Sequence, residues 1–223
     1  MLTPTLLDLC CGAGGATIGY MRAGFDVTGV DLHPHPRYPA PQIRADVIDV
    51  LETLARYPWT RRGYHAIHVS PPCQADCTLT IGTNADRGDH TSYTARCLEL
   101  LEDIGLPYIC EQPDGRAPLR KDLRLCGEMF DLGVLRHRNF QLGTLTIPQP
   151  THKSHRGPVR GWRHGVYRDG PYVAAYGNGG GKATIAEMQD AMDIDWVEDR
   201  RGLTEAIPPA YTAYIGTHLM GQL

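Results

Sequence analysis

The sequence predicts an α/β fold built on an open, mostly parallel sheet with helices on both faces. Short apolar runs alternate along the N-terminal part of the chain with segments of helical character. A glycine-rich turn, Gly12-Ala13-Gly14-Gly15, follows the first apolar run directly. Alternating strands and helices form parallel sheets, and glycines allow the tight passage from strand to helix that such a sheet requires.

The expected elements follow from short apolar runs and from the residues that interrupt them. Each expected strand is apolar and stops at a glycine, a proline or a charged residue. These strands are 5–9, 25–30, 64–69 and 107–110, with a shorter stretch at 43–45. The expected helices are 16–23, 47–57, 91–104, 184–192 and a last one that starts at Pro208-Pro209. Four prolines between positions 34 and 41 predict an irregular, exposed loop.

Composition is typical of a globular protein with one well-buried domain. The 223 residues are 42% hydrophobic and 21% charged, and no apolar run approaches the length of about 20 residues that spans a bilayer. The first residues lack a basic segment ahead of the apolar stretch, so we expect no signal peptide and a cytoplasmic location. The net charge of -3 argues against a wholly basic nucleic-acid binder.

Cysteine spacing predicts reduced thiols and no metal site. The seven cysteines are an odd number without the rhythm of a disulfide framework. Cys73 with Cys77, and His33 with His35, have no second pair at a spacing typical of zinc ligands.

Polar residues and glycines gather at the ends of the expected strands. Gly12 to Gly15, Asp31, Asp46, Cys73 and Glu111 all follow such strands, whose carboxyl ends form the ligand-binding edge of a parallel sheet. A carboxylate such as Asp31 at the end of the second strand can bind both hydroxyls of a ribose. Because the turn lacks the full G-x-G-x-x-G pattern, an adenosine-type cofactor fits better than a dinucleotide.

These motifs, in this order, resemble the DNA cytosine-5 methyltransferases. The resemblance is carried by Asp8-Leu9-Cys10-Cys11-Gly12-Ala13-Gly14-Gly15, Pro71-Pro72-Cys73-Gln74, Glu111, Arg136-x-Arg138, residues 184–195, Ala206-Ile207-Pro208-Pro209 and Tyr214-Ile215-Gly216. It implies a Rossmann-like class I methyltransferase fold, S-adenosyl-L-methionine as cofactor with S-adenosyl-L-homocysteine as product, and double-stranded DNA as substrate. It also implies a compact monomer of bacterial or phage type, without metal or membrane attachment.

The resemblance assigns catalytic roles to Cys73, Glu111, Arg136 and Arg138. The Cys73 thiolate would add to C6 of a cytosine that has rotated out of the duplex, which activates C5 for methylation. Glu111 would act at the base N3, and the two arginines at O2 and nearby phosphates. Expected cofactor contacts are Asp8, Cys10, Gly12, Ala13, Gly14, Gly15, Asp31, Leu32, Asp46, Val47 and Pro71. The chain departs from the family at Gln112, where an asparagine is usual.

A basic stretch lies where the family inserts its target-recognition region. We expect a catalytic core at 1–142, a short recognition insert at 143–180 and a C-terminal segment at 181–223 that returns to the core. Trp162 and Tyr167 are interleaved with the basic residues of this insert. So short an insert predicts a recognition sequence of about two to four base pairs. Expected DNA contacts are Gln74, Lys153, Arg156, Arg160, Arg163 and Arg168.

Three alternatives stay open from the sequence. A related enzyme could transfer another group to C5 or act on RNA or a free nucleotide. A catalytically silent DNA-binding module could keep the same fold, although the intact Cys73, Glu111 and Arg138 argue against it. The turn spacing disfavours the third, a nicotinamide-dependent oxidoreductase.

Overall fold

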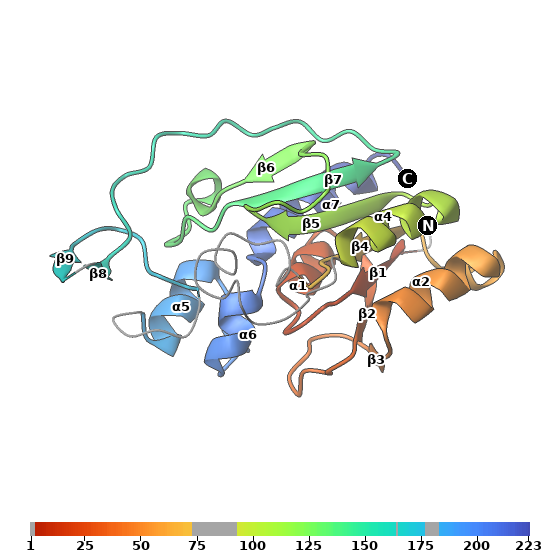
Figure 1. Ribbon diagram of the computed structural model, residues 1–223, viewed down its shortest axis with the longest axis horizontal. Coiled ribbons are helices and arrows are strands. Elements are labelled where there is room, and N and C mark those ends of the chain that lie inside the picture. Colours follow the sequence, from red (N-terminus) through yellow and green to blue (C-terminus); the bar gives the residue numbers. More distant parts are fainter. Residues whose placement is uncertain (1–2, 73–92, 164, 177–182) are drawn as a thin grey trace.

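The computed structural model describes residues 3–72, 93–163, 165–176 and 183–223. Its centre is a seven-stranded sheet in the order β3-β2-β1-β4-β5-β7-β6 (Figure 1). All neighbours from β3 to β5 pair in parallel, whereas β7 is antiparallel to both β5 and β6. The strands are β1 (Thr5–Leu9), β2 (Asp26–Asp31), β3 (Gln42–Arg44), β4 (Ala66–Val69), β5 (Tyr108–Pro113), β6 (Leu123–Leu125) and β7 (Arg138–Gly143). The mostly parallel α/β fold predicted from the sequence is confirmed.

Helices cover both faces of this sheet. On one face α1 (Gly15–Arg22) and α7 (Pro209–Met220) pack over Leu6 of β1, and on the other α2 (Val47–Arg56) and α4 (Tyr93–Ile104) pack over Leu7 and Leu9. Successive residues of a strand point to opposite faces, so one short apolar strand supplies both layers of the core. Two 3-10 turns, η1 (Thr60–Gly63) and η2 (Gly127–Phe130), lie between strands.

The pairing of α1 with α7 depends on close approach of their backbones. A Cβ at Gly19 would lie 2.2 Å from the carbonyl oxygen of Pro209, so only glycine fits there. The Thr212 hydroxyl donates a hydrogen bond to the Ala16 carbonyl at 2.8 Å. The final helix starts at Pro209, as predicted, and it closes the core against the first helix.

The helical expectations for the C-terminal segment are largely confirmed. Thr184 caps α5 (Ile185–Met192) through a reciprocal capping box with Glu187, in agreement with the predicted helix 184–192. A short helix, α6 (Arg200–Glu205), was not anticipated, and Asp199 caps it by accepting a hydrogen bond from Gly202. Together α5 and α6 enclose a third apolar cluster that includes Met188, Leu203 and Ala13 of the glycine turn.

One predicted strand is longer in the structure than we expected. β5 continues past Cys110 to Pro113, because β7 pairs with it along its whole length and places Glu111 opposite Phe140. Glu111 therefore lies within the strand and not after it. The expectation of a strand ending at 110 was wrong, since the apolar pattern stops there while the antiparallel ladder does not.

The chain leaves β7 in an extended segment that runs beside β6 to a small hairpin, β8 (Gly161–Arg163) and β9 (Val166–Arg168), at the far end of the molecule (Figure 1). The Gln149 side-chain amide accepts from the Arg124 N–H at 2.9 Å and donates to the Arg124 carbonyl at 2.7 Å. This single side chain thus satisfies the exposed edge of β6. No helix in the described part of the chain is long and apolar enough to cross a membrane.

Candidate active site

The strand order reverses between β1 and β4, and the carboxyl ends of these strands form the crevice in which α/β sheets bind ligands. The glycine turn borders this crevice after β1. Gly12 and Gly14 have φ values of +49° and +86°, which favour glycine. A Cβ at Gly12 would meet nothing within 4 Å, whereas at Gly14 it would lie 2.5 Å from Pro39 and at Gly15 2.2 Å from the Ile207 carbonyl. Of these three, Gly12 is the one that borders open space.

Asp31, at the end of β2, is tied to the glycine turn. Its carboxylate accepts hydrogen bonds from the Gly12 N–H at 2.9 Å and from the His33 N–H at 2.8 Å. A carboxylate has about four lone-pair positions, so two remain for the hydroxyls of a ribose. Leu32 beside it is 49% exposed and offers an apolar surface at the same edge. The donor set and the apolar neighbour fit a nucleoside cofactor.

Asp8 lies inside the molecule. It is fully buried, and its carboxylate accepts a hydrogen bond from the Thr17 hydroxyl at 2.5 Å. Thr17 is 2.5 Å from the hydroxyl of Tyr38, which comes from the proline-rich loop. Burial raises the pKa of Asp8 to about 7. Asp8 therefore holds α1 against β1, and its predicted contact with a cofactor stays a prediction.

The proline-rich loop is irregular, as predicted, but it is not wholly exposed. Tyr38 is half-buried, and its ring occupies the space where a Cβ at Gly29 would lie. Sequence reasoning missed Tyr38 as part of this region. Its signal, an aromatic residue among prolines, does not distinguish a packed loop from a free one.

The other expected cofactor residues lie at the same edge of the sheet. Asp46 caps α2 by accepting a hydrogen bond from the Ile48 N–H at 2.8 Å, and Val47 is buried in the first turn of that helix. Cys10 has a positive φ of 56°, and burial raises the pKa of its thiol. Pro71 is buried after β4. These positions border the crevice, and contact with a cofactor remains a prediction for each.

Glu111 is a buried carboxyl group beside a guanidinium. The Arg138 Nε lies 2.7 Å from Glu111 Oε1, and the two side chains are 15% and 6% exposed. The contact is ionic, since this oxygen accepts no well-aligned hydrogen bond from a described residue. Burial raises the pKa of Glu111, and Arg138, Arg136 and a hydrogen bond from Ser70 partly oppose that rise.

A chain of buried hydrogen bonds leads from Tyr20 of α1, through His68 of β4, to Glu111 of β5. The Tyr20 hydroxyl is 2.9 Å from His68 Nδ1, and His68 Nε2 is 2.8 Å from the Ser70 hydroxyl. Burial lowers the pKa of His68 to about 3, so its imidazole is neutral and carries one N–H. Because Ser70 donates to Glu111, it accepts from His68 Nε2–H, which leaves Nδ1 to accept from Tyr20. Sequence reasoning missed this chain, since His68 lies inside an apolar strand.

Arg136 is held differently from the expectation for a base-contacting residue. Its backbone has a φ of +36°. Its terminal nitrogens donate to the Ala175 carbonyl at 2.6 Å and to the Thr204 carbonyl at 2.7 Å. It still lies close enough to Glu111 to lower the pKa of that group. In this arrangement Arg136 joins the end of the insert to α6, and its contact with cytosine stays a prediction.

Cys73 and Gln74 lie outside the described residues, which stop at Pro72 on this side. The chain that leads to them is anchored by Gln112. Its amide donates to the Pro71 carbonyl at 2.8 Å, and the side chain is 1% exposed. In the sequence, Gln112 is recognisable only as a departure from the family pattern. In the structure its amide positions the exit of β4.

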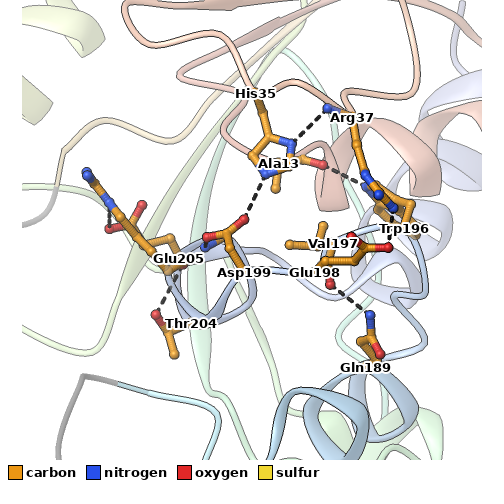
Figure 2. A network of polar contacts seen from close by, with 12 residues as sticks. Ala13, His35, Arg37, Gln189, Trp196, Val197, Glu198, Asp199, Thr204 and Glu205 are labelled. Atoms are coloured by element: carbon orange, nitrogen blue, oxygen red, sulfur yellow. Dashed lines mark hydrogen bonds and ion pairs between the residues drawn. The ribbon is translucent and has the colours of Figure 1, made fainter.

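A network of polar contacts ties the glycine turn to the C-terminal segment (Figure 2). The Trp196 indole N–H donates to the Ala13 carbonyl at 2.8 Å, and His35 Nε2 lies 3.0 Å from Asp199. Arg37 pairs with Glu198. Sequence reasoning missed this clamp. The segment that resembles the family, residues 184–195, ends one position before Trp196.

The basic residues expected to bind DNA divide into two groups. Arg156 Nε is 3.0 Å from Glu128, and Arg160 pairs with Glu187. Residues 149–168 include no acidic residue, but the fold brings Glu128 and Glu187 to them, so these two charges are partly neutralised. Lys153 and Arg168 are exposed and form no ion pair with any described residue, and Arg163 lies in β8.

No protein-family model and no curated protein matches this chain. One similar solved structure, from E. coli, is described as a prophage-encoded DNA modification methyltransferase, with a TM-score of 0.64, 12% identity, and coverage of 98% of this chain and 99% of that one. Another is a methyltransferase of Entamoeba histolytica, with a TM-score of 0.55, 13% identity, and coverage of 100% and 99%.

The chain has the methyltransferase fold. At such low identity the likeness concerns the fold alone, yet it extends over nearly the full length of both chains. The Rossmann-like class I methyltransferase architecture expected from the motifs is thereby confirmed.

Proposed function

We propose that this chain is an S-adenosylmethionine-dependent DNA methyltransferase that acts on carbon 5 of cytosine. The observation that carries the proposal is the ion pair of Arg138 Nε and Glu111 Oε1, 2.7 Å apart at the carboxyl side of the sheet, in which Glu111 is buried and Arg138 is half-buried. Gln112, the neighbour of Glu111, anchors the strand exit that leads to Pro72-Cys73. A buried acid with a raised pKa next to the approach to a cysteine is what addition to a pyrimidine ring requires.

The cofactor half of the proposal rests on Gly12, Asp31 and Leu32. Gly12 borders open space, Asp31 retains acceptor positions for ribose hydroxyls, and Leu32 can cover one face of the adenine. S-adenosylmethionine, when bound there, supplies the electrophilic methyl group that C5 attacks. The methyltransferase fold of the structural neighbours agrees with this assignment.

The chemistry assigned to the chain has four steps. The Cys73 thiolate bonds to C6 of cytosine, and the displaced electron pair moves into the ring toward N3. A proton shared between the Glu111 carboxyl group and N3 neutralises the charge that develops there. C5 then takes the methyl group, which leaves S-adenosyl-L-homocysteine, and N3 returns its proton to Glu111. A water molecule takes the C5 proton, and the electron pair of that C–H bond re-forms the double bond between C5 and C6 as the Cys73 sulfur leaves as a thiolate.

The assignment of double-stranded DNA as substrate rests on the β8–β9 hairpin and the basic segment before it. Trp162 and Tyr167 are 63% and 50% exposed on this hairpin, and the cations of Lys153 and Arg168 are free of ion pairs with described residues. Exposed aromatic rings and free cations suit base and phosphate contact. The E. coli structural neighbour is itself described as a DNA modification methyltransferase. Arg156 and Arg160 would contribute only after exchanging their acidic partners for phosphates.

A transfer assay with labelled S-adenosylmethionine tests the proposal. We expect methyl incorporation into duplex DNA and its loss in Cys73→Ala, because no other group would activate C5. Cys77→Ala, four residues further along, is the matched control and should keep activity. A duplex that carries 5-fluorocytosine should become covalently bound to the native chain and not to Cys73→Ala.

The same assay separates the alternatives. RNA and dCMP are offered beside the duplex, and incorporation into either of them alone would replace DNA as the substrate. Full activity of Cys73→Ala would rule out the covalent route. Binding of S-adenosylhomocysteine without any transfer to the three substrates would indicate a catalytically silent module.

A further inference from the structure

Four potential metal ligands converge outside the proposed active site. Cys126 follows β6, His137 directly precedes β7, and His152 and His155 lie in the extended segment after β7. Their ligand atoms all lie within 4.8 Å of one another. Cys126 is buried, His137 is half-buried, and His152 and His155 are exposed.

Three of the six distances among these ligand atoms match those of a tetrahedral zinc site, and the other three are within 4.8 Å. His137 Nε2 and His152 Nε2 are 3.4 Å apart, His152 Nε2 and His155 Nε2 are 3.3 Å apart, and Cys126 Sγ is 3.6 Å from His155 Nε2. With Zn–N near 2.05 Å and Zn–S near 2.3 Å, tetrahedral angles place two nitrogens about 3.3 Å apart and nitrogen and sulfur about 3.6 Å apart.

Hydrogen bonds alone do not account for this arrangement. His152 Nε2 faces both His137 Nε2 and His155 Nε2, and His155 Nε2 also faces Cys126 Sγ. The Nε2 of an imidazole carries either one proton or one lone pair, so it can serve only one such partner. A cation at the centre would bind all three nitrogen lone pairs and the thiolate at once.

We propose that Cys126, His137, His152 and His155 bind a structural Zn²⁺ ion. One thiolate and three imidazoles supply four protein ligands, and a closed tetrahedral site of this kind, with no position for a reacting water, is the feature that separates structural from catalytic zinc. The soft sulfur and the borderline nitrogens favour Zn²⁺ over Mg²⁺ or Ca²⁺, which prefer oxygen ligands. The sequence expectation of no metal rested on paired spacing, whereas these ligands are spread from position 126 to position 155.

Contacts of neighbouring residues position the segments that carry these ligands. Arg156, next to His155, pairs with Glu128, which is two residues from Cys126, and the Arg156 N–H donates to the Tyr172 hydroxyl at 2.9 Å. Gln149 binds the edge of β6 on the other side of the cluster. Zn²⁺ would thus fasten the start of the insert to the sheet edge. The Arg138 guanidinium donates a hydrogen bond to the backbone carbonyl of His137 at 3.0 Å, so the residue that pairs with Glu111 directly follows a ligand of the cluster.

Metal analysis of the untagged full chain tests the site. After removal of metal with a chelator and reconstitution with Zn²⁺, mass spectrometry should find about one ion per chain. Co²⁺ in its place should give the visible bands of tetrahedral coordination and a sulfur-to-cobalt charge-transfer band. The chelator should lower the melting temperature of the native chain, because the ion binds only the folded state.

Two ligand variants and one control complete the test. His152→Gln changes an exposed side chain, so it should fold, and it should weaken Zn²⁺ binding by more than about tenfold. Cys126→Ser should abolish the charge-transfer band. His218→Gln, in α7 and outside the cluster, should bind metal as the native chain does. Absence of Zn²⁺ after reconstitution, or unchanged affinity in both ligand variants, would overturn the proposal. None of these readouts depends on methyl transfer, so they are independent of the proposed function.

Discussion

Two buried residues of neighbouring strands have pKa values that are shifted in opposite directions. Asp8 in β1 pairs in register with His68 in β4. Burial raises the pKa of Asp8 to about 7 and lowers that of His68 to about 3. Both groups are therefore kept neutral by the same physical cause, the loss of hydration in the core.

These shifts predict the pH dependence of stability. Between about pH 4 and 7 the folded chain holds a proton on Asp8 that the unfolded chain releases, so this group lowers the free energy of unfolding as the pH rises. His68 acts oppositely between about pH 3 and 6.5, because there the unfolded chain binds the extra proton. The two contributions largely cancel over the range that they share.

Asp8→Asn should remove the contribution of Asp8 to this pH dependence and leave that of His68. We expect the free energy of unfolding of the variant, relative to the native chain, to rise as the pH is raised from 4 to 7. The change could reach about 4 kcal/mol, since a tenfold change in acidity corresponds to about 1.4 kcal/mol. Urea unfolding at several pH values measures it, and a difference that does not vary with pH would contradict the shifted pKa of Asp8.

At the scale of elements, β5 does more than contribute to the sheet. Glu111 and Gln112 are consecutive, so they point to opposite faces, and each performs a separate task. Glu111 meets Arg138 because β7 pairs antiparallel with β5, which places Arg138 opposite Pro113 and on the same face as Glu111. Gln112 reaches the Pro71 carbonyl on the other side.

Gln112→Met tests whether the β4 exit must be held in place. The substitution keeps the volume but removes the hydrogen bond to Pro71, and we expect kcat to fall by about tenfold or more while S-adenosylhomocysteine binding is unchanged. Gln141→Met is the matched control, because Gln141 is another buried glutamine of this sheet, whose amide bonds to Tyr108. Equal losses of activity in both variants would mean that destabilisation alone is responsible.

At the scale of the molecule, the C-terminal segment completes a site built mainly from the N-terminal half. Trp196, Glu198 and Asp199 contact the glycine turn and the loop after β2, which are far away in sequence (Figure 2). Helix α7 packs on α1, the helix that directly follows the glycine turn, and so supports that turn. The edge of the sheet proposed to bind the cofactor is thus held by segments from both ends of the chain.

Trp196→Phe should loosen this clamp with little change in packing. Loss of the hydrogen bond to the Ala13 carbonyl corresponds to about 1 kcal/mol, so we expect S-adenosylhomocysteine to bind about fivefold more weakly in calorimetry. Trp162→Phe, in the exposed hairpin, should leave that affinity unchanged. The clamp would have no part in cofactor binding if Trp196→Phe bound as tightly as the native chain.

Local sequence located strands β1 to β5, the glycine turn and most helix boundaries, whereas strands β6 to β9 and helix α6 were not anticipated. Proline and glycine positions, apolar periodicity and capping residues act over a few neighbouring residues, so the first strand and the last helix could be placed from the sequence. The order of the motifs likewise indicated the methyltransferase fold and the edge at which Asp31 lies.

Tertiary structure alone decided which side chains meet. The register of β5 with β7 extended the strand and joined Glu111 to Arg138, and the fold brought Glu128 and Glu187 to the basic insert. The Cys126 and histidine cluster was likewise assembled from three separate segments. Local patterns do not specify such contacts, because they depend on strand order and on the path of the chain between elements.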